Sequence, residues 1–556
     1  MHIYVLALLI LALSATAANK AQTPGITMGE FANLMMSGLF ELPGSMIGLG
    51  YNTAGVMGAK FLDSAGCRVE ADEDEDACRN ISQMIRSRGF GVEEYQIKTE
   101  DGYILSIQRV INPLVDPAYR PKMKPVLLMH GVFSTADNWV FQSLYVRPNP
   151  WPLGPQTQPE QVPTAGRVKL SPAESDRRHP RSLAFYLANH GYDVWLGNFR
   201  GNFYCLKHVQ LSVVDPEFWN FSLDEQVDYD LPEHIRFIQR TTGHQKIAYV
   251  GWSQGATIMF ALQADHPEYA DIIEPFVALG PVAYIHNTKT PAKLFMPLIP
   301  IAQGLNLGFS FSDVLRYAMQ KICGPTPPQK LLCLDLAGQV YGDDKEGFEV
   351  KRFGTFLHHF PGGSSFKDVA HYSQLIMSRK FARYNWGVVG NMRKYGNVFP
   401  PDYNLANIRS KSMVFFTGVN DFLADPADVH LLVKTMSAKP MQWFNMAKEI
   451  PRWNHMDYVH HKLAGELVNR RVVEIMDKFR LRDSKLDAPA QVPDQITAQV
   501  QAQIHQIPDQ MPVQVAAMIQ PQIPVQASVQ VSSQIPDQPQ ISTFNNGQYQ
   551  AVPMMG

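Results

Sequence analysis

A serine with one glycine two positions before it and another two positions after it has the setting of a residue that attacks ester or amide carbonyls. The pentapeptide GWSQG at 251–255 follows an apolar run at 247–250 and precedes a helix-compatible run at 256–264. A tight strand-to-helix turn needs small residues beside the serine, and it lifts the hydroxyl to the end of the strand. The helix that starts there directs the positive end of its dipole at the site, which favours an anion. We therefore predict Ser253 as a nucleophile.

A serine hydroxyl is a weak nucleophile unless a histidine takes its proton and an acid orients that histidine. In chains with this kind of turn, the acid follows the serine and the histidine comes last. The apolar run at 413–416 leads to Asp421, and His455 follows. This order predicts Asp421 as the acid and His455 as the base. Four nearby residues compete for these roles, and spacing alone does not exclude them: Asp425, Asp457, His460 and His461.

The tetrahedral intermediate of acyl transfer carries a negative oxygen, which needs backbone N–H donors. One donor is expected from Gln254, directly after the nucleophile. The other is expected from the loop after an early strand, where the apolar run at 126–129 leads to His130, Gly131 and Val132. Val132 is therefore the second candidate oxyanion residue, and His130 is expected to brace the loop rather than act as a base.

Short apolar runs, separated by helix-like segments, must position these residues. Leu231, Ile235 and Ile238 recur at helical spacing, for example, and residues 95–110 alternate around a turn at 100–102, which indicates a hairpin. Buried strands that alternate with helices favour an α/β fold with a mainly parallel central sheet and helices on both faces. The buried strands are expected at residues 126–129, 193–196, 247–250, 276–279 and 413–416.

Composition shifts divide the chain into segments. Residues 1–17 combine an apolar run with small residues that fit a signal-peptidase site; the alternative is a membrane anchor, for which the run is short. The tail at 484–556 is rich in Gln and Pro and is expected to be disordered. The other expected segments are a Gly-rich, acidic N-terminal extension at 18–78, a core at 79–284 with a surface insertion at 147–180, a cap at 285–395, and a second core part at 396–483.

Overall composition limits the partners and the compartment. The formal net charge is −2, and 18% of the 556 residues are charged, which argues against a nucleic-acid partner. Beyond the first residues no stretch reaches the apolar length of a membrane-spanning helix, so none is expected in the mature chain. The five cysteines form no CxxC pair, so no metal site is expected. Asn80 and Asn220 lie in glycosylation sequons, which suits a secreted protein or, alternatively, a lysosomal one.

With these motifs in hand, the chain resembles the acid lipase family, the group of gastric lipase and lysosomal acid lipase, from about residue 80 to residue 479. Trp252 departs from the pattern, because many members have His at this position. The matching segments include NISQMI at 80–85, TEDGYIL at 99–105, HGVFSTADNW at 130–139, GYDVWLGNFRGN at 191–202, VGWSQG at 250–255, NDFLADPADV at 420–429 and NHMDYV at 454–459.

The resemblance implies an α/β-hydrolase fold with an inserted cap or lid. It implies Ser253 as nucleophile, His455 as base and Asp421 as acid, and the choice of Asp421 over Asp425 rests on this match. It also implies Val132 and Gln254 as the oxyanion donors. A disulfide is expected between Cys323 and Cys333, because a proline-rich turn separates them and the family has a bridge in this region of the cap.

The implied activity is hydrolysis of neutral lipid esters, triacylglycerols or cholesteryl esters, at an oil–water interface through an acyl-enzyme. No metal or cofactor is expected for this chemistry. One alternative is a carboxylesterase that acts on smaller soluble esters. Another is a non-catalytic protein that binds or stores lipid on the same fold.

Overall fold

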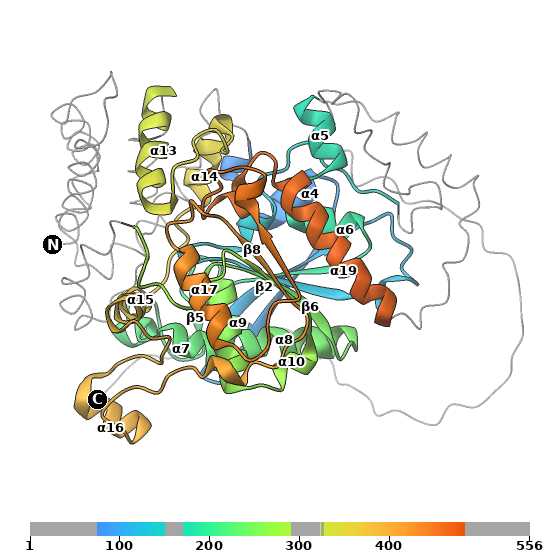
Figure 1. Ribbon diagram of the computed structural model, residues 1–556. Helices are drawn as coiled ribbons and strands as arrows, with labels where there is room; N and C mark the ends of the chain where they lie inside the picture. Colours follow the sequence, from blue (N-terminus) through green and yellow to red (C-terminus); the bar gives the residue numbers. More distant parts are fainter. Residues whose placement is uncertain (1–74, 151–170, 291–322, 324–326, 484–556) are drawn as a thin grey trace, which may run out of the picture. The chain divides into compact units, whose positions relative to one another are not determined.

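The computed structural model describes residues 75–150, 171–290, 323 and 327–483, and a nine-stranded mixed sheet lies at the centre of this part (Figure 1). The strand order is β1-β2-β4-β3-β6-β7-β8-β9, and β5 pairs with β2. From β4 to β9 all neighbours are parallel, whereas β1, β2 and β5 pair antiparallel. The strands are β1 (Gly91–Lys98), β2 (Tyr103–Ile111), β3 (Pro125–Met129), β4 (Asp193–Gly197), β5 (Lys207–His208), β6 (Ile247–Trp252), β7 (Ile273–Leu279), β8 (Met413–Thr417) and β9 (Gln442–Asn445).

The five buried strands and the hairpin expected from the sequence are confirmed. Strands β3, β4, β6 and β8 are buried at every residue, which is why each reads as a continuous apolar run rather than an alternating one. Parallel strands place their carboxyl ends at one edge of the sheet, so the segments after β3, β6 and β8 lie close together. Those segments carry the candidate oxyanion loop, the candidate nucleophile and the candidate acid.

Helices pack on both faces of the sheet, which gives two apolar cores. Leu128 of β3 belongs to the core shared with α6 and α19, whereas Leu127 belongs to the core shared with α8, α9 and α17. The helices of the described residues are α4 (Ile81–Ser87), α5 (Pro172–Arg178), α6 (Leu183–Asn189), α7 (Leu223–Glu225), α8 (Leu231–Thr242), α9 (Gln254–Asp265), α10 (Tyr269–Ile272), α13 (Pro327–Tyr341), α14 (Phe353–His359), α15 (Phe366–Ser378), α16 (Gly387–Tyr395), α17 (Pro426–Thr435), α18 (Asp457–His460) and α19 (Arg470–Asp483).

The segment predicted as a cap lies between β7 and β8. Its described residues form α13 to α16 and add no strand to the central sheet (Figure 1). The expected disulfide between Cys323 and Cys333 is present, with the two Cα atoms 5.6 Å apart, and it anchors the chain before α13 to that helix. Cys78 is also disulfide-bonded, and Cys205 is a buried free thiol.

Several predicted segments lie outside the described residues: the signal peptide, the extension up to residue 74, residues 151–170 of the insertion, and the tail. Within the described ranges, no helix is both long enough and apolar enough to cross a membrane. Asn80 is exposed and caps α4, whereas the half-buried Asn220 hydrogen-bonds Glu217 and Lys367. Glycosylation at either residue stays a prediction.

Candidate active site

Ser253 sits in a sharp turn between β6 and α9. Its φ of +54° and ψ of −115° are unusual for a residue with a side chain, and such strain typically costs about 1–3 kcal/mol and concentrates at functional sites. The glycines on either side make the turn possible. A Cβ at Gly251 would collide with the backbone of Gly255, and a Cβ at Gly255 would collide with the carbonyl of Met129. The spacing of the pentapeptide is therefore a steric requirement.

A continuous chain of contacts links Ser253 to His455 and Asp421. His455 Nε2 lies 2.7 Å from Ser253 Oγ, and His455 Nδ1 lies 2.9 Å from each carboxylate oxygen of Asp421. The exposed fractions of the three residues are 6% for Ser253, 1% for His455 and 0% for Asp421. The serine hydroxyl can thus donate to Nε2 while Nδ1–H donates to the carboxylate, which is the proton path that acyl transfer requires.

Asp421 is fixed by three donors besides the histidine. Its Oδ1 accepts the backbone N–H groups of Leu423 at 3.0 Å and Ala424 at 2.7 Å, and its Oδ2 accepts the Tyr458 hydroxyl at 3.2 Å. Hydrogen bonds to an ionised carboxylate are stronger than those between neutral groups, so these donors restrain the side chain firmly. The buried carboxylate is therefore held in one orientation toward His455.

The backbone of His455 is held from two sides. Its N–H donates to the carbonyl of Tyr341, at the end of α13, over 3.1 Å. Its carbonyl accepts from Trp252 Nε1 over 3.0 Å, and the Trp252 ring packs at 6.0 Å from the His455 ring. The tryptophan that departs from the family pattern is thus a direct contact of the candidate base.

The loop after β3 lies against the nucleophile. A Cβ at Gly131 would come within 3.2 Å of Ser253 Cβ, so glycine permits this close approach. Among the described residues the backbone N–H groups of Val132 and Gln254 have no hydrogen-bond acceptor, which leaves both for a ligand oxygen. The ring of His130 is buried, which lowers its pKa to about 4, and its Nε2 accepts a backbone N–H from the segment after β4 at 3.2 Å. These contacts are those of a structural brace.

The competing residues have other partners. Asp425 caps α17 by accepting the N–H of Ala427 at 2.9 Å, and it pairs with Lys289 at 2.9 Å. His460 hydrogen-bonds Gln142 at 2.7 Å, and burial lowers its pKa to about 3.

The other two competitors each accept a backbone N–H of their own loop. Asp457 accepts the N–H of Asn454 at 2.6 Å, and His461 Nδ1 accepts the N–H of Leu463 at 2.9 Å. The described residues contain no cluster of three or more His, Cys, Asp or Glu side chains that could hold a metal ion.

Comparison with known proteins agrees with the fold and the order of motifs. Residues 81–143 match a family described as a partial alpha/beta-hydrolase lipase region, and residues 172–304 match the alpha/beta hydrolase fold. Gastric triacylglycerol lipase of Rattus norvegicus is 35% identical over 72% of this chain and 92% of its own length. The Homo sapiens gastric lipase is 34% identical over 72% of this chain and 91% of its own length. Lysosomal acid lipase/cholesteryl ester hydrolase of Homo sapiens is 32% identical over 73% of this chain and 93% of its own length. The chain therefore belongs to the acid lipase family of α/β-hydrolases.

Proposed function

We propose that this protein hydrolyses carboxylic esters of neutral lipids, triacylglycerols or cholesteryl esters, with Ser253 as nucleophile, His455 as base and Asp421 as acid. The observation that carries the proposal is the unbroken contact from Ser253 Oγ through His455 to Asp421, at 2.7 Å and 2.9 Å. The lipid substrates are supported by the relatives, which are named as triacylglycerol and cholesteryl ester hydrolases.

The reaction proceeds in two half-reactions. Ser253 Oγ bonds to the ester carbonyl carbon while His455 takes its proton, and the carbonyl oxygen becomes an anion that Val132 and Gln254 stabilise through their N–H groups. His455 then gives the proton to the leaving alcohol, and an acyl-enzyme remains. Water attacks the acyl carbon with His455 again as base, and the fatty acid and free Ser253 are released. Asp421 stabilises the transient imidazolium throughout.

The nucleophile needs an opening before a lipid can reach it. Ser253 is only 6% exposed, so part of the protein over it must move for substrate to enter. We propose that helices of the segment at 285–395 act as the cap that moves, because the described ones lie outside the central sheet, while Tyr341, at the end of α13, stays bonded to His455.

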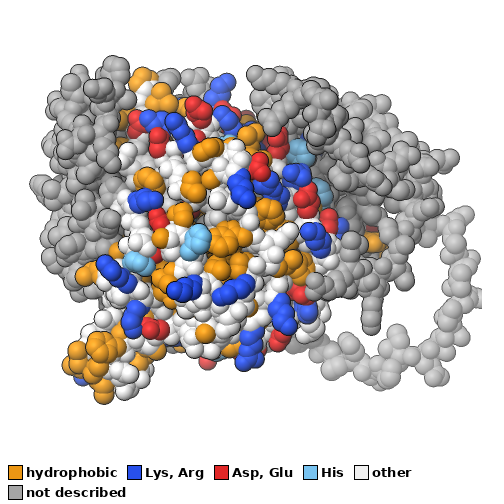
Figure 2. Space-filling model, viewed as in Figure 1, with side chains coloured by type: hydrophobic (Ala, Val, Ile, Leu, Met, Phe, Trp, Pro, Cys, Tyr) orange, Lys and Arg blue, Asp and Glu red, His pale blue; other side chains and the backbone are white. Residues whose placement is uncertain are grey.

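An exposed apolar surface on α16 and the chain just after it supports contact with lipid. Figure 2 shows hydrophobic side chains gathered over α16. Val389 is 65% exposed and Phe399 is 71% exposed, and contiguous apolar surface of this kind marks sites of protein or membrane contact. Arg393 and Lys394 lie on the same helix, as basic residues do beside lipid surfaces. We call this surface the α16 patch; its exposed apolar residues are Val388, Val389, Met392, Val398 and Phe399.

Polar replacements in the α16 patch are expected to affect emulsified substrates selectively. The double variant Val389→Ser/Phe399→Ser should lower the rate on emulsified triolein about tenfold, because each apolar side chain buried in lipid contributes up to about 1.5–3 kcal/mol. Turnover of a soluble short-chain ester should stay unchanged. Val209→Ser is a matched control, since Val209 is 56% exposed and lies outside the patch. Equal losses on both substrates, or no loss on the emulsion, would contradict the assignment.

A substrate panel tests the proposed function itself. The purified protein would be assayed on triolein, cholesteryl oleate and p-nitrophenyl butyrate over a range of pH values. We expect the emulsified long-chain esters to be hydrolysed. Activity on p-nitrophenyl butyrate alone would instead indicate a carboxylesterase, and lipid binding without turnover would indicate a carrier or storage protein.

We also propose that the protein enters the secretory pathway and acts outside the cell or in the lysosome. Support comes from the disulfide between Cys323 and Cys333, since such bonds persist in oxidising compartments. The names of the relatives, gastric lipase and lysosomal acid lipase, also support entry into the secretory pathway. Fractionation of cells that express the full chain tests the proposal, and accumulation in the cytosol would contradict it.

A further inference from the structure

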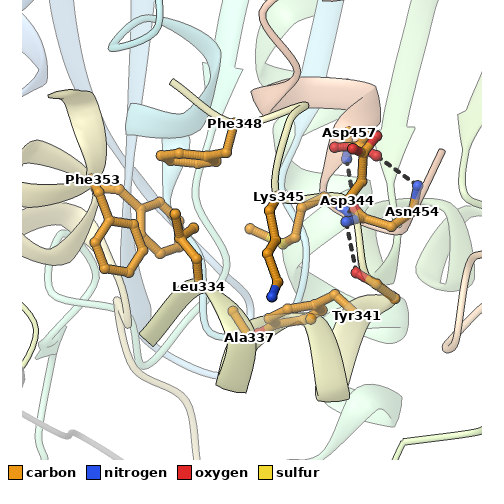
Figure 3. A pocket seen from close by; sticks show the side chains of 13 residues that line it. Leu334, Ala337, Tyr341, Asp344, Lys345, Phe348, Phe353, Asn454 and Asp457 are labelled. Atoms are coloured by element: carbon orange, nitrogen blue, oxygen red, sulfur yellow. Dashed lines mark hydrogen bonds between the residues drawn. The ribbon is translucent and has the colours of Figure 1, made fainter. Parts of the chain in front are cut away.

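Two buried carboxyl groups, Asp344 and Asp457, meet beside an apolar pocket between α13 and α18 (Figure 3). Their exposed fractions are 7% and 3%. One oxygen of each is occupied: Asp457 Oδ2 accepts the N–H of Asn454 at 2.6 Å, and Asp344 Oδ1 accepts the N–H of Gly347 at 3.1 Å. The second oxygen of each carboxyl group, Asp457 Oδ1 and Asp344 Oδ2, still needs a hydrogen-bond donor.

The two remaining oxygens border the same small space, and the two carboxyl groups act on each other through a side-chain hydrogen bond. A Cβ at Gly347 would lie 3.0 Å from Asp344 Oδ2 and 3.0 Å from Asp457 Oδ1, so both oxygens face the space that this glycine leaves open. Asp344 Oδ2 is buried, and no N–H or hydroxyl group of the described residues donates to it. Two ionised carboxylates that border one buried space repel each other, whereas one shared proton satisfies both oxygens.

No positive charge of the neighbouring described residues takes the place of that proton by pairing with the two carboxylates. His461 Nε2 lies 3.8 Å from Asp344 Oδ2, but its Nδ1 accepts a backbone N–H and burial lowers its pKa to about 3, so the ring is neutral. Burial raises the pKa of Asp344 and raises that of Asp457 well above its usual value. Lys345 pairs with Asp335. The other charged groups that act on the pair are Arg452, which favours ionisation of Asp344, and Glu346 and Asp421, which oppose ionisation of the pair.

The pair lies where the segment after α13 meets both candidate catalytic loops. Tyr341 ends α13 and residues 342–344 follow it, and Asp457 comes two positions after His455. The same segment is bonded to the loops that carry the acid and the base. Three hydrogen bonds make this connection: His455 N–H to Tyr341 O at 3.1 Å, Asn454 Nδ2 to Gly342 O at 2.8 Å, and Asn420 Nδ2 to Asp343 O at 3.0 Å.

We propose that Asp344 and Asp457 share one proton and are positioning residues for His455. The shared proton holds residues 341–344 against the loop of the base. When the proton leaves to solvent at higher pH, the two negative charges repel, the loop shifts, and His455 loses its alignment with Ser253. The inference rests on the proposed role of His455 as base, and it makes the site most active on the acidic side of the pair's titration.

The test uses asparagine, whose amide N–H can replace the shared proton permanently. In Asp344→Asn, Oδ1 still accepts the N–H of Gly347 while Nδ2 donates to Asp457 Oδ1. For the wild type, kcat on a soluble short-chain ester should fall by up to about tenfold per pH unit above the pair's pKa. Asp344→Asn should retain its kcat and lose this decline, whereas Asp344→Ala should lower kcat more than it changes KM. Asp343→Asn, an exposed neighbour, is the matched control and should follow the wild-type profile.

Thermal unfolding gives a second readout that does not need ester turnover. A carboxyl with a raised pKa in the folded state keeps a proton that the unfolded chain releases near its ordinary pKa, so stability falls as pH rises through the folded pKa. The melting temperature of the wild type should fall over that range, and the melting temperature of Asp344→Asn should not. If Asp344→Asn does not fold, Asp457→Asn replaces it, because its amide oxygen can still accept the N–H of Asn454 while its NH₂ donates to Asp344 Oδ2.

Identical pH dependences of both kcat and melting temperature in the wild type and the asparagine variants would overturn the shared proton. If the wild type and the asparagine variants differ in the pH dependence of melting temperature but not in that of kcat, the carboxyl groups share a proton but do not position His455. If the wild type hydrolyses no ester at all, the proposed function fails, and the melting curves still decide whether the proton is shared.

Discussion

Ser253→Ala is expected to lower kcat on a soluble ester by at least about 10⁴-fold, because the other groups of such a site retain only a small residual catalysis. The melting temperature should change little. The side chain is one hydroxyl, and its described partner is His455 Nε2 at 2.7 Å. The check is a comparison of kcat, KM and thermal unfolding in the two proteins.

A surface serine supplies the matched control for this substitution. Ser437 is exposed, in the turn after α17, and Ser437→Ala should keep full activity. Substantial turnover by a well-folded Ser253→Ala protein would remove Ser253 as the nucleophile. Loss of activity together with a large drop in melting temperature would instead show that Ser253 is needed for the fold.

Asp421→Asn is expected to have the second-largest effect, a fall in kcat of about 10³- to 10⁴-fold. An asparagine amide has one accepting oxygen, so it cannot accept hydrogen bonds both from the loop N–H groups and from His455 as the two carboxylate oxygens do. If its oxygen accepts the N–H groups of Leu423 and Ala424, its NH₂ faces Nδ1 of His455 as a donor. That arrangement favours the tautomer with the proton on Nε2, which cannot accept the proton of Ser253.

Asp425→Asn is the paired comparison, since spacing alone left Asp425 as a rival. Asparagine caps a helix about as well as aspartate does, so α17 should keep its N-terminal cap. The lost ion pair with Lys289, which is half exposed, is worth no more than about 1 kcal/mol. Near-normal kcat is therefore expected. A larger fall in kcat for Asp425→Asn than for Asp421→Asn would identify Asp425 as the acid instead.

The central strands could be predicted from the sequence because they are buried along their whole length. Short continuous apolar runs bounded by turns are typical of buried strands, and β3, β4, β6 and β8 lie at the positions of these runs. Strand β9 was not predicted. It has four residues of alternating burial at the end of the strand order, so it resembles an ordinary surface segment.

The candidate triad could be predicted because its parts follow strand ends in a fixed order. The choice between Asp421 and Asp425 could not come from spacing, since both lie in the segment between β8 and α17, and it rested on the family resemblance. In the sequence Trp252 is only a departure from the family pattern, because its bond to the His455 carbonyl joins residues far apart in the chain.

Tyr341 and Asp344 were missed altogether as neighbours of the site. They belong to the segment between β7 and β8, which reaches His455 through tertiary packing and carries no local motif. Tyr458 lies within a matched segment, yet its contact with Asp421 depends on how α18 packs. Contacts of this kind follow from the arrangement of whole elements, so residue patterns along the chain do not reveal them.

Covalent labelling tests the central claim most directly. A fluorophosphonate with a long alkyl chain would be mixed with the full chain, so that the serine oxygen bonds to phosphorus, fluoride leaves and His455 takes the proton. We predict one adduct per chain, on the peptide that contains Ser253, with ester hydrolysis lost in proportion to labelling. Ser253→Ala should remain unlabelled. An adduct at another residue, or full activity after Ser253 is completely labelled, would contradict the account.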